Sequence, residues 1–421
     1  MDVIIKPSKL SGEVIIPPSK SLAHRAIIAA SLAEGISTIK NIDYSDDINA
    51  TIDAMIELGA NITKDGDNLI INGCFPLSKD KHINAFESGS TLRFLIPIAM
   101  LSDGISHFEG INNLNNRPLD VYLNIFDELG IKYKKKDNAS LPLSIYDRLI
   151  PSTYKLRGDV SSQFITGLLF ALPLLNGDSK IVLKTPLESK GYVDLTLEIL
   201  RLYGIKIINN DYNEFIIFGN QKYRPYNYKV EGDYSQAAFF LVADALGADI
   251  KIKGLNVRSI QGDKKILNDL EDFRLKIDNE LDYLNVSGIP KGTKISFKNS
   301  PDLLPALCML ASMSQGESFF VDAERLRLKE SDRLSSMKLE LEKLGIKVSE
   351  TLDSLTFFGK DSFSGGICDS HNDHRIAMAL SLASLRCDEE IRIDGAECVK
   401  KSYPNYWQTF ENLGGIIEYV K

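Results

Sequence analysis

The sequence has few cysteines and no pattern that would pair them. Its five cysteines, Cys74, Cys308, Cys368, Cys387 and Cys398, are scattered, and no two are separated by only two residues. Small secreted proteins that depend on disulfides usually carry an even number of cysteines at regular spacings. The odd count therefore indicates reduced thiols and predicts a cytoplasmic protein.

Long hydrophobic runs are also missing. The longest apolar segments, residues 94–101 and 168–175, are short and contain proline, whereas a membrane-spanning helix needs about 20 consecutive apolar residues. The N-terminus shows no apolar stretch typical of a signal peptide, and no transit or lipidation pattern. We therefore expect no membrane partner.

Positive charge is in deficit. The 421 residues include 49 lysines and arginines against 57 aspartates and glutamates, a formal net charge of -8. Proteins that bind nucleic acids or anionic membranes usually present a basic surface, so the composition argues against both partners. Any anion-binding site must be a local concentration of basic residues.

A chain of this length favours two domains rather than one.

A repeat of about 70 residues runs through the whole chain. Each copy has the end of a helix, a glycine and then an alternating strand, and the copies are spaced by 69 to 74 residues. The glycines are Gly59, Gly130, Gly204, Gly345 and Gly414, and a weaker fourth copy has Arg274 at the same place. A glycine at this point favours the left-handed conformation that ends many helices.

The content of the repeats predicts an α/β (α+β) fold with two domains of three units each. Residues 61–73 and 347–359 have the turn chemistry of β-hairpins. Residues 46–59 predict an amphipathic helix with Ile48, Ile52, Met55, Ile56 and Gly59 on one side. A solenoid would use shorter repeats. Because an isolated strand precedes the first unit and another ends the last, we expect one discontinuous domain, residues 1–18 plus 232–421, and a second domain, residues 19–231.

Basic and hydroxyl residues gather where predicted helices start. In residues 15–26, Ser19, Lys20, Ser21, His24 and Arg25 precede an apolar helix, and Ser19 or Ser21 could cap it. Unpaired N–H groups at a helix start, together with a lysine and an arginine, attract phosphate or carboxylate. An ordinary capped helix with solvated charges is the alternative.

Similar arrangements occur in six further segments: residues 87–94, 115–120, 158–164, 324–334, 370–383 and 399–407. The densest is residues 324–334, with Arg325, Arg327, Lys329, Glu330 and Arg333. If the units are pseudo-symmetric, these helix starts point into one cleft between the domains. Such a cleft would suit small molecules with several negative groups.

Residues 368–375 contain side chains of the types that bind zinc. Cys368, His371 and His374 recur every third residue, with Asp369 and Asp373 between them. A structural zinc site normally has a fourth ligand from a second paired motif, and the chain has no CxxC or HExxH. We therefore expect no metal.

Seven segments together resemble the 5-enolpyruvylshikimate-3-phosphate (EPSP) synthase family. They read PPSKSLAHR, SGSTLR, NNRP, SSQF, RLRLKESDR, NDHRIAMA and KKSYPNYW, in order, and the similarity runs from residue 6 to about residue 410. The resemblance implies the two-domain enolpyruvyl transferase fold, with three βαβαββ repeats in each domain and the active site in the cleft between domains. It also implies transfer of the enolpyruvyl group of phosphoenolpyruvate to the 5-hydroxyl of shikimate 3-phosphate by addition and elimination. Phosphate is released, and neither a metal nor an organic cofactor takes part.

The resemblance also implies a role for particular residues. The phosphate of phosphoenolpyruvate would be surrounded by Lys20, Gly89, Arg117, Gln163 and Lys401, and its carboxylate would be held by Arg333 and Arg375. The carboxylate of shikimate 3-phosphate would bind Ser21 and Arg25; its phosphate would bind Ser161, Ser162, Gln163 and Ser189, with Tyr192 alongside; and its ring hydroxyls would bind Asp302 and Lys329. Lys20, Asp302 and Glu330 would transfer protons, and the sequence leaves open which of these residues transfers which proton. Asp46 matches an aspartate near the family's cleft, and His24 receives no role.

Three positions depart from the common pattern of the family. Glu87, Ser90 and Phe94 stand where many relatives have asparagine, threonine and proline. Sensitivity to the inhibitor glyphosate is therefore not predicted. The substrates are the expected partners, and the protein is expected to be a monomer.

Two rival functions fit the sequence less well. The sister transferase that acts on UDP-N-acetylglucosamine uses a cysteine near the equivalent of Arg117, but this chain has no cysteine between Cys74 and Cys308. A sliding clamp, another repeat-built α/β protein, would place basic residues along helices that line a hole, not at helix starts beside glycine and serine.

Overall fold

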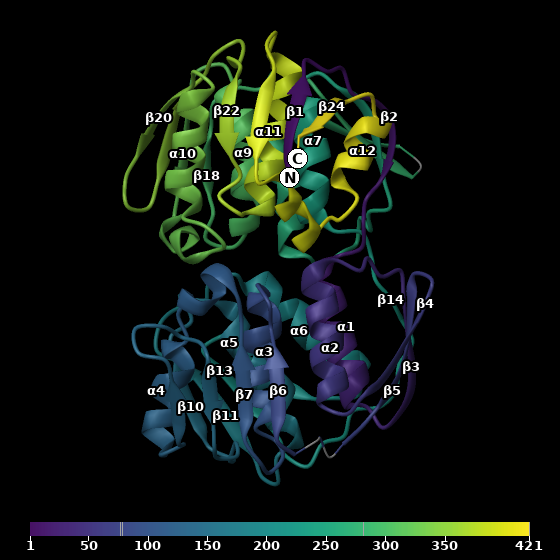
Figure 1. The fold of residues 1–421 in the computed structure, drawn as a ribbon, viewed down its shortest axis with the longest axis vertical. Helices are drawn as coiled ribbons and strands as arrows, with labels where there is room; N and C mark the ends of the chain where they lie inside the picture. Colours follow the sequence, from purple (N-terminus) through teal and green to yellow (C-terminus); the bar gives the residue numbers. More distant parts are fainter. Residues whose placement is uncertain (76, 78, 281, 421) are drawn as a thin grey trace. The chain divides into compact units, whose positions relative to one another are not determined.

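The computed structural model describes residues 1–75, 77, 79–280 and 282–420. The chain divides into two compact units (Figure 1): unit 1 consists of Met1–Pro17 and Glu231–Lys421, and unit 2 of Pro18–Val230. Each limit lies one residue before the one expected from sequence. The chain thus begins and ends in unit 1.

Unit 2 contains three four-stranded sheets of one design, in which the first two strands are parallel and the last two run antiparallel. In spatial order these are β14 (Tyr228–Lys229), β3 (Gly35–Lys40), β5 (Asn68–Gly73) and β4 (Asn61–Asp65); β6 (Lys81–Asn84), β7 (Ser106–Glu109), β9 (Leu143–Ile145) and β8 (Tyr133–Lys135); and β10 (Thr153–Leu156), β11 (Ser179–Leu183), β13 (Glu214–Ile217) and β12 (Ile207–Asn210).

Unit 1 contains three more sheets of the same design. In spatial order these are β2 (Ser11–Ile15), β15 (Asp249–Lys253), β17 (Tyr283–Ser287) and β16 (Lys276–Glu280); β18 (Lys294–Ser296), β19 (Glu317–Val321), β21 (Leu355–Phe358) and β20 (Lys347–Glu350); and β22 (Gly366–Asp369), β23 (Ile391–Asp394), β1 (Asp2–Lys6) and β24 (Ile416–Val420). Strand β1 pairs with β23 and with β24, so the N-terminal strand completes the last repeat.

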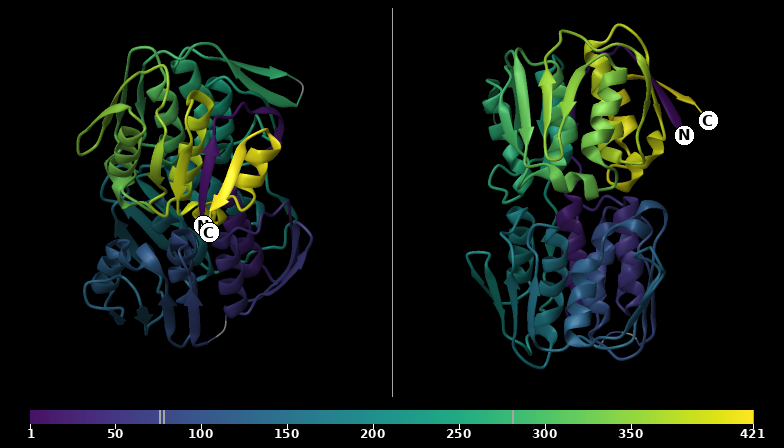
Figure 2. Two further views of the ribbon diagram at one scale, coloured as in Figure 1. Left: turned by 45° about the horizontal axis from the view of Figure 1, so that its top comes forward. Right: turned by 90° about the vertical axis from the view of Figure 1, so that its left-hand side faces the viewer.

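Two α-helices accompany each sheet. In unit 2 they are α1 (Lys20–Leu32), α2 (Asp46–Glu57), α3 (Gly89–Ala99), α4 (Asp120–Leu129), α5 (Ser162–Ala171) and α6 (Lys190–Leu202). In unit 1 they are α7 (Tyr234–Ala245), α8 (Ile266–Asp272), α9 (Leu304–Ser312), α10 (Arg333–Lys343), α11 (His374–Ser381) and α12 (Tyr406–Asn412). Figure 2 gives two further views of this arrangement. The predicted βαβαββ repeat and mixed α/β fold are confirmed.

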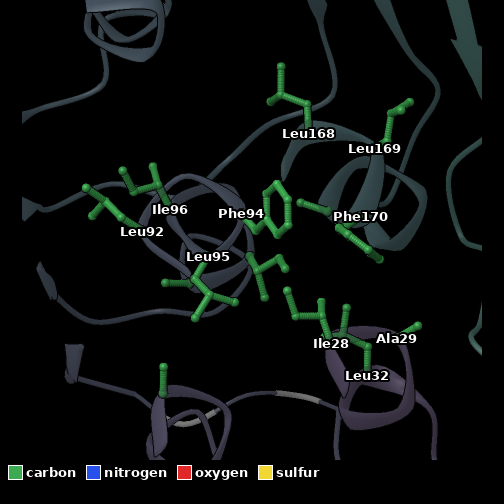
Figure 3. Close-up of a cluster of buried hydrophobic side chains, with 14 of the residues drawn as sticks. Ile28, Ala29, Leu32, Leu92, Phe94, Leu95, Ile96, Leu168, Leu169 and Phe170 are labelled. Atoms are coloured by element: carbon green, nitrogen blue, oxygen red, sulfur yellow. The ribbon is translucent and has the colours of Figure 1, made fainter. Parts of the chain in front are cut away.

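Three central helices form the core of unit 2. Side chains of α1, α3 and α5 meet there, and the rings of Phe94 and Phe170 lie side by side (Figure 3). Only Lys20 and Ser21 of α1, Ser90 of α3 and Gln163 of α5 escape full burial, and all four lie in the first turn of their helices. Because a helix that is apolar all round must be covered on every side, only the N-terminal ends of these helices are available for function. In unit 1, α7, α9 and α11 are buried along their whole length.

Local predictions are confirmed in the main and wrong in two details. Residues 61–73 and 347–359 contain the antiparallel pairs β4–β5 and β20–β21. Ile56, however, is 46% exposed, because the buried face of α2 is centred on Thr51, which bonds to His24 and Thr91. Ser19 takes the N-cap position of α1, but its buried hydroxyl makes no capping bond, and no other partner is present among the described residues.

Arg274 occupies the glycine position of the fourth repeat in the same left-handed conformation as the glycines. Its φ is +65°, beside +68° for Gly130. A side chain in this conformation costs roughly 1–2 kcal/mol, and glycine does not have that cost. We expect Arg274→Gly to raise the free energy of unfolding by about 1 kcal/mol in urea denaturation. Gly130→Ala is the matched control, because a Cβ there meets no atom within 4 Å; it should lower the free energy by a similar amount. A loss in both variants would contradict the conformational explanation.

Candidate functional site

The first turn of α1 is joined to its neighbours by two basic side chains. Lys20 Nζ donates to Asp47 Oδ2 at 2.6 Å, which joins α1 to the start of α2. Arg25 donates through Nε to Thr196 Oγ1 at 2.9 Å and through Nη2 to the carbonyl of Tyr192 at 2.9 Å, both on α6. Its third bond, from Nη1, goes to the carbonyl of Ser21 at 2.6 Å. The N-terminal halves of α1, α2 and α6 are therefore held together.

Arg25 is a buried cation stacked on an aromatic ring. It is 3% exposed, and its guanidinium carbon lies 5.1 Å from the ring centre of Phe94. Burial lowers the pKa of Arg25 to about 10, so the side chain is still charged at neutral pH. A guanidinium held by an aromatic face and three fixed acceptors is preorganised to bind a carboxylate or phosphate.

The starts of α3 and α5 are joined by an amide. Gln163 accepts from Arg93 Nη1 at 2.7 Å and donates to Ser90 Oγ at 2.9 Å. Ser161 caps α5 by accepting from the N–H of Gln163. Gly89 begins α3, and a Cβ there would lie 2.5 Å from Arg117 Nη1, so a larger residue would displace this guanidinium.

The remaining candidates of unit 2 lie at the starts of α5 and α6. Ser162 is the first residue of α5. Ser189 precedes α6 with φ of +56°, a left-handed conformation uncommon for serine, and is 2% exposed. Tyr192 lies in the first turn of α6, whose Thr196 also bonds to Thr166 of α5 at 2.9 Å. Strained backbone of this kind is often found at ligand sites.

We call these residues the unit 2 cluster: Lys20, Ser21, Arg25, Gly89, Arg93, Arg117, Ser161, Ser162, Gln163, Ser189 and Tyr192. They lie in the N-terminal halves of α1, α3, α5 and α6 or on the segments before these helices and before α4, and the bonds above join α1, α3, α5 and α6. Helix N-termini carry partial positive charge from unpaired N–H groups. With four cationic side chains added, the cluster is chemically suited to small anions.

Asp302 lies at the centre of a second group of candidates, in unit 1. It is in the 3-10 turn Pro301–Leu303 that leads into α9. Its carboxylate accepts from Arg333 Nη1 at 2.8 Å and Arg375 Nη2 at 3.2 Å, and Lys329 Nζ is 3.4 Å away. Burial alone would raise the pKa of Asp302, but Arg375, Lys329 and Arg333 outweigh it and hold the pKa well below its usual range. Asp302 is therefore ionised at neutral pH.

Arg333 is surrounded by three carboxylates. Besides Asp302, it donates to Glu330 Oε2 at 2.9 Å and through Nε to Asp373 Oδ2 at 2.8 Å. The Arg333 side chain is 1% exposed, and Asp373 is fully buried. Burial would lower the pKa of Arg333, but Asp373, Glu330 and Asp302 raise it well above its usual value. The guanidinium is thus a fixed positive charge.

Two further cations complete this group. Arg375, on α11, also donates to Ser235 Oγ of α7 at 3.0 Å. Lys401, at the end of the 3-10 helix Ala396–Lys401, donates to the carbonyl of Asn372 at 2.7 Å. Burial lowers the pKa of Lys329, against the opposing effect of Asp302. We call the group the unit 1 cluster: Ser235, Asp302, Lys329, Glu330, Arg333, Asp373, Arg375 and Lys401.

Several residues in or bonded to the two clusters carry no site assignment from the sequence. Asp47 carries the bond to Lys20, whereas the resemblance to the family points to its neighbour Asp46. Asp373 was identified only as part of a motif, and its role as the acceptor for Arg333 depends on tertiary contact. Thr196 lies within an ordinary helical pattern, so nothing in the sequence marks it. Arg93 stood out beside a glycine turn but received no assignment.

The three positions that depart from the family pattern all lie in or beside the unit 2 cluster. Glu87 accepts from Asn112 Nδ2 at 2.8 Å. Ser90 accepts from Gln163, and Phe94 forms the surface on which Arg25 stacks.

The motif considered for zinc is used differently. His371 bonds to Glu340, burial raises the pKa of the Cys368 thiol to about 12, and His374 is buried. Across residues 1–75, 77, 79–280 and 282–420, no three side chains of histidine, cysteine, aspartate or glutamate form a group that could hold a metal ion.

In the same part of the chain, no helix has both the length and the apolar character needed to cross a membrane.

Comparisons with known proteins identify the family of the chain. Residues 4–410 match the family model described as EPSP synthase (3-phosphoshikimate 1-carboxyvinyltransferase). Proteins named 3-phosphoshikimate 1-carboxyvinyltransferase are 51% identical in Clostridium perfringens (strain ATCC 13124), over 99% of each chain, and 50% identical in Clostridium beijerinckii, over 98% of each chain.

Solved structures support the same relationship. The EPSP synthase of Acinetobacter baumannii superposes over 100% of both chains with a TM-score of 0.83 and 26% identity. The enolpyruvyl transferase NikO of Streptomyces tendae, with a TM-score of 0.82 and 18% identity, shares the fold. The match over nearly the whole chain and the identity of about half to several relatives lead to one conclusion: this chain belongs to the EPSP synthase family.

Proposed function

We propose that the protein catalyses the reaction of phosphoenolpyruvate with shikimate 3-phosphate to form 5-enolpyruvylshikimate 3-phosphate and inorganic phosphate. The observation that carries this proposal is the match to the EPSP synthase family over residues 4–410. The chemistry of the two clusters supports it. Each substrate has one phosphate and one carboxylate, and the clusters supply eight cationic side chains in a chain whose net charge is -8.

Phosphoenolpyruvate is assigned to cations of both clusters. Lys20, Arg117 and Lys401 would bind its phosphate, with Gln163 as a neutral donor and Gly89 leaving space. Arg333 and Arg375 would bind its carboxylate. A guanidinium has five N–H donors, and Arg333 already uses most of them on three carboxylates. Arg375 would therefore make the larger share of direct contacts, while Arg333 supplies charge and holds Asp302 in place.

Shikimate 3-phosphate is assigned mainly to the unit 2 cluster. Its carboxylate would bind Arg25 and Ser21. Its phosphate would bind the hydroxyl and amide groups at the starts of α5 and α6: Ser161, Ser162, Gln163 and Ser189, with Tyr192 alongside. Hydroxyl groups at a helix start bind a phosphate without adding further positive charge. Asp302 and Lys329 would bind the ring hydroxyls.

Proton transfer is assigned to Asp302 and Glu330, with a contribution from Lys20. The direction of the Asp302 pKa favours a role as acceptor, because a carboxyl held well below its usual pKa is ionised at neutral pH and has no proton to donate. We therefore assign to Asp302 the proton of the 5-hydroxyl. Glu330 is 24% exposed and accepts from Arg333, and we assign to it the proton exchanged at the methylene carbon of phosphoenolpyruvate.

The test is release of inorganic phosphate from phosphoenolpyruvate in the presence of shikimate 3-phosphate, in buffer treated with a metal chelator. We expect release that requires both substrates and an enolpyruvyl product detected by mass spectrometry. UDP-N-acetylglucosamine serves as the competing acceptor. Turnover of that acceptor instead would assign the sister activity, and no release with either acceptor would contradict the proposal.

We propose further that the protein acts as a monomer in the cytoplasm. All five cysteines are unpaired in the structure, and four of them are buried. Sedimentation at the concentration of the activity assay tests the monomer, and a stable dimer would contradict it.

A further inference from the structure

The loop between β22 and α11 has an unusual backbone and two polar anchors. His371 and Asn372 both have positive φ, +51° and +53°. Ser370 fixes the start of the loop, with its N–H on the carbonyl of Asp394 at 3.0 Å and its hydroxyl on the carbonyl of Gly395 at 3.0 Å. Two successive left-handed residues that are not glycine cost conformational energy. Such a loop persists only where side chains hold it.

His371 is the side chain that ties this loop to α10. Its Nε2 lies 2.7 Å from Glu340 Oε1, and Glu340 is fully buried. The other oxygen of Glu340 accepts from the N–H of Asp369 at 2.9 Å and from Lys343 Nζ at 2.8 Å. The N–H of His371 in turn donates to Asp369 Oδ1 at 2.6 Å. The loop is thus fixed to a buried carboxylate on the helix that begins with Arg333.

The residues that follow His371 in the loop hold two cations of the unit 1 cluster. The carbonyl of Asn372 accepts from Lys401 Nζ at 2.7 Å. Asp373 caps α11 and accepts from Arg333 Nε at 2.8 Å. Both contacts depend on the backbone path set one and two residues earlier, at His371. A change in this path would move the acceptors of Lys401 and Arg333 together.

We infer that His371 is a positioning residue for phosphoenolpyruvate: its bond to Glu340 holds residues 370–373 in the conformation that sets the places of Lys401 and Arg333. The inference rests on the proposed function, which assigns these two cations to that substrate. His371 itself touches no substrate in this scheme. His371 belongs to the Cys368, His371 and His374 motif, and in the structure it binds a glutamate.

The ion pair between His371 and Glu340 depends on pH, because it requires a protonated histidine. The bond to Glu340 raises the pKa of His371 above its ordinary value, against the effect of burial. The charged groups that face the pair are Glu340 and Lys343 on α10 and Asp369 in the loop; Cys368 on β22 and Asp394 on β23 lie beside them. Because the pKa is raised on folding, the contribution of the ion pair is complete below about pH 6.5, the ordinary value for histidine. It is lost as the pH rises through the raised value.

The experiment compares KM for phosphoenolpyruvate across pH 6–9 in the wild type, His371→Gln and His371→Arg. We expect KM of the wild type to rise about 3- to 10-fold over this range. Glutamine keeps a neutral donor, so KM should lie above that of the wild type at pH 6, approach it towards pH 9 and lack the histidine step, with little change in kcat. Arginine keeps a permanent charge, so KM should stay low without the histidine step in its pH profile.

His107→Gln is the matched control. His107 is a partly buried histidine of unit 2 that bonds to Ser144 at 2.8 Å and stacks on His82. It should leave KM and its pH profile unchanged. The inference is overturned if His371→Gln keeps the KM and pH profile of the wild type. It is also overturned if all substitutions at His371 lower kcat and thermal stability together, which would mark a purely structural role.

A second measurement does not depend on activity. The chain has only five histidines, so the imidazole signals can be assigned by NMR with the His371→Gln variant as reference. The pKa of His371 should lie above 6.5 and fall towards it in Glu340→Gln. An unchanged pKa would overturn the inference even in an active enzyme. If the wild type releases no phosphate, the proposed function fails on its own, independently of the NMR result.

Discussion

Asp302→Asn is expected to lower kcat by about 10²- to 10⁴-fold, the range for loss of a general base, with little change in the affinity for phosphoenolpyruvate. Asparagine keeps the shape and can still accept one of the two arginine bonds through its amide oxygen, but its NH2 group faces the other guanidinium and the side chain cannot accept a proton. It also removes a negative charge beside three cations. KM for the anionic substrate should therefore stay the same or fall. Steady-state kinetics with each substrate varied in turn separates the two effects.

Asp244→Asn is the matched control for this substitution. Asp244 lies on the same unit, near the other end of α7 from Ser235, and accepts from the N–H groups of Ile250 and Val286. Its loss should reduce stability but leave kcat of the folded enzyme unchanged. If Asp302→Asn weakened substrate binding and kept kcat, Asp302 would be a substrate contact and not the base.

Stability at low pH gives an independent check on Asp302. Its pKa is lowered on folding, so its contribution to stability is present above about pH 3.9, the ordinary value for aspartate. That contribution is lost as the pH falls through the lowered value of the folded state. The free energy of unfolding of Asp302→Asn should therefore fall less steeply at low pH than that of the wild type, whereas the control Asp244→Asn should keep the decrease due to Asp302. The same dependence of the free energy on acidic pH in both variants would contradict the lowered pKa.

Arg333→Met is expected to lower the free energy of unfolding by about 3–5 kcal/mol, the usual cost of removing one partner from a buried ion pair. Methionine fills much of the same space but leaves Asp373 without its cation in a fully buried site. Asp302 and Glu330 lose a donor as well. Urea denaturation followed by circular dichroism measures the loss, and Arg333→Lys should recover only part of it because ammonium lacks the planar fork.

Arg327→Met is the control for this effect. Arg327 also bonds to two carboxylates, Glu350 at 2.7 Å and Asp332 at 2.8 Å, but its side chain is 20% exposed and water reaches the pair. We expect less than half of the loss seen for Arg333→Met. Equal losses would mean that burial does not set the energy of the Arg333 cluster.

The repeat could be predicted from sequence because its signals are local. A glycine at the end of a helix and an alternating strand after it depend on backbone conformation and side-chain period, both of which are visible within about ten residues. Even Arg274, which lacks the glycine, takes the same left-handed conformation. Family membership could be predicted for the same reason, since its motifs are short continuous segments.

The partners of the site residues could not be predicted in this way. Lys20 was identified, but its acceptor Asp47 lies 27 residues away; Arg25 was identified, but Thr196 lies 171 residues away. Nothing in a helical pattern distinguishes Thr196 from other helical threonines. The pKa of Asp302 was equally open, because the sequence contained reasons for a raised and for a lowered value.

The repeat, the expected division into two domains of three units, and the family can all be predicted from the sequence, since each depends on local pattern or on continuous motifs. Which charges meet depends on the three-dimensional fold. It brought three cations onto Asp302 and three carboxylates onto Arg333, and it turned His371 onto a buried glutamate. The physical reason is that the strength of a charge interaction depends on distance and on exclusion of water, and both are set by segments far apart in the chain.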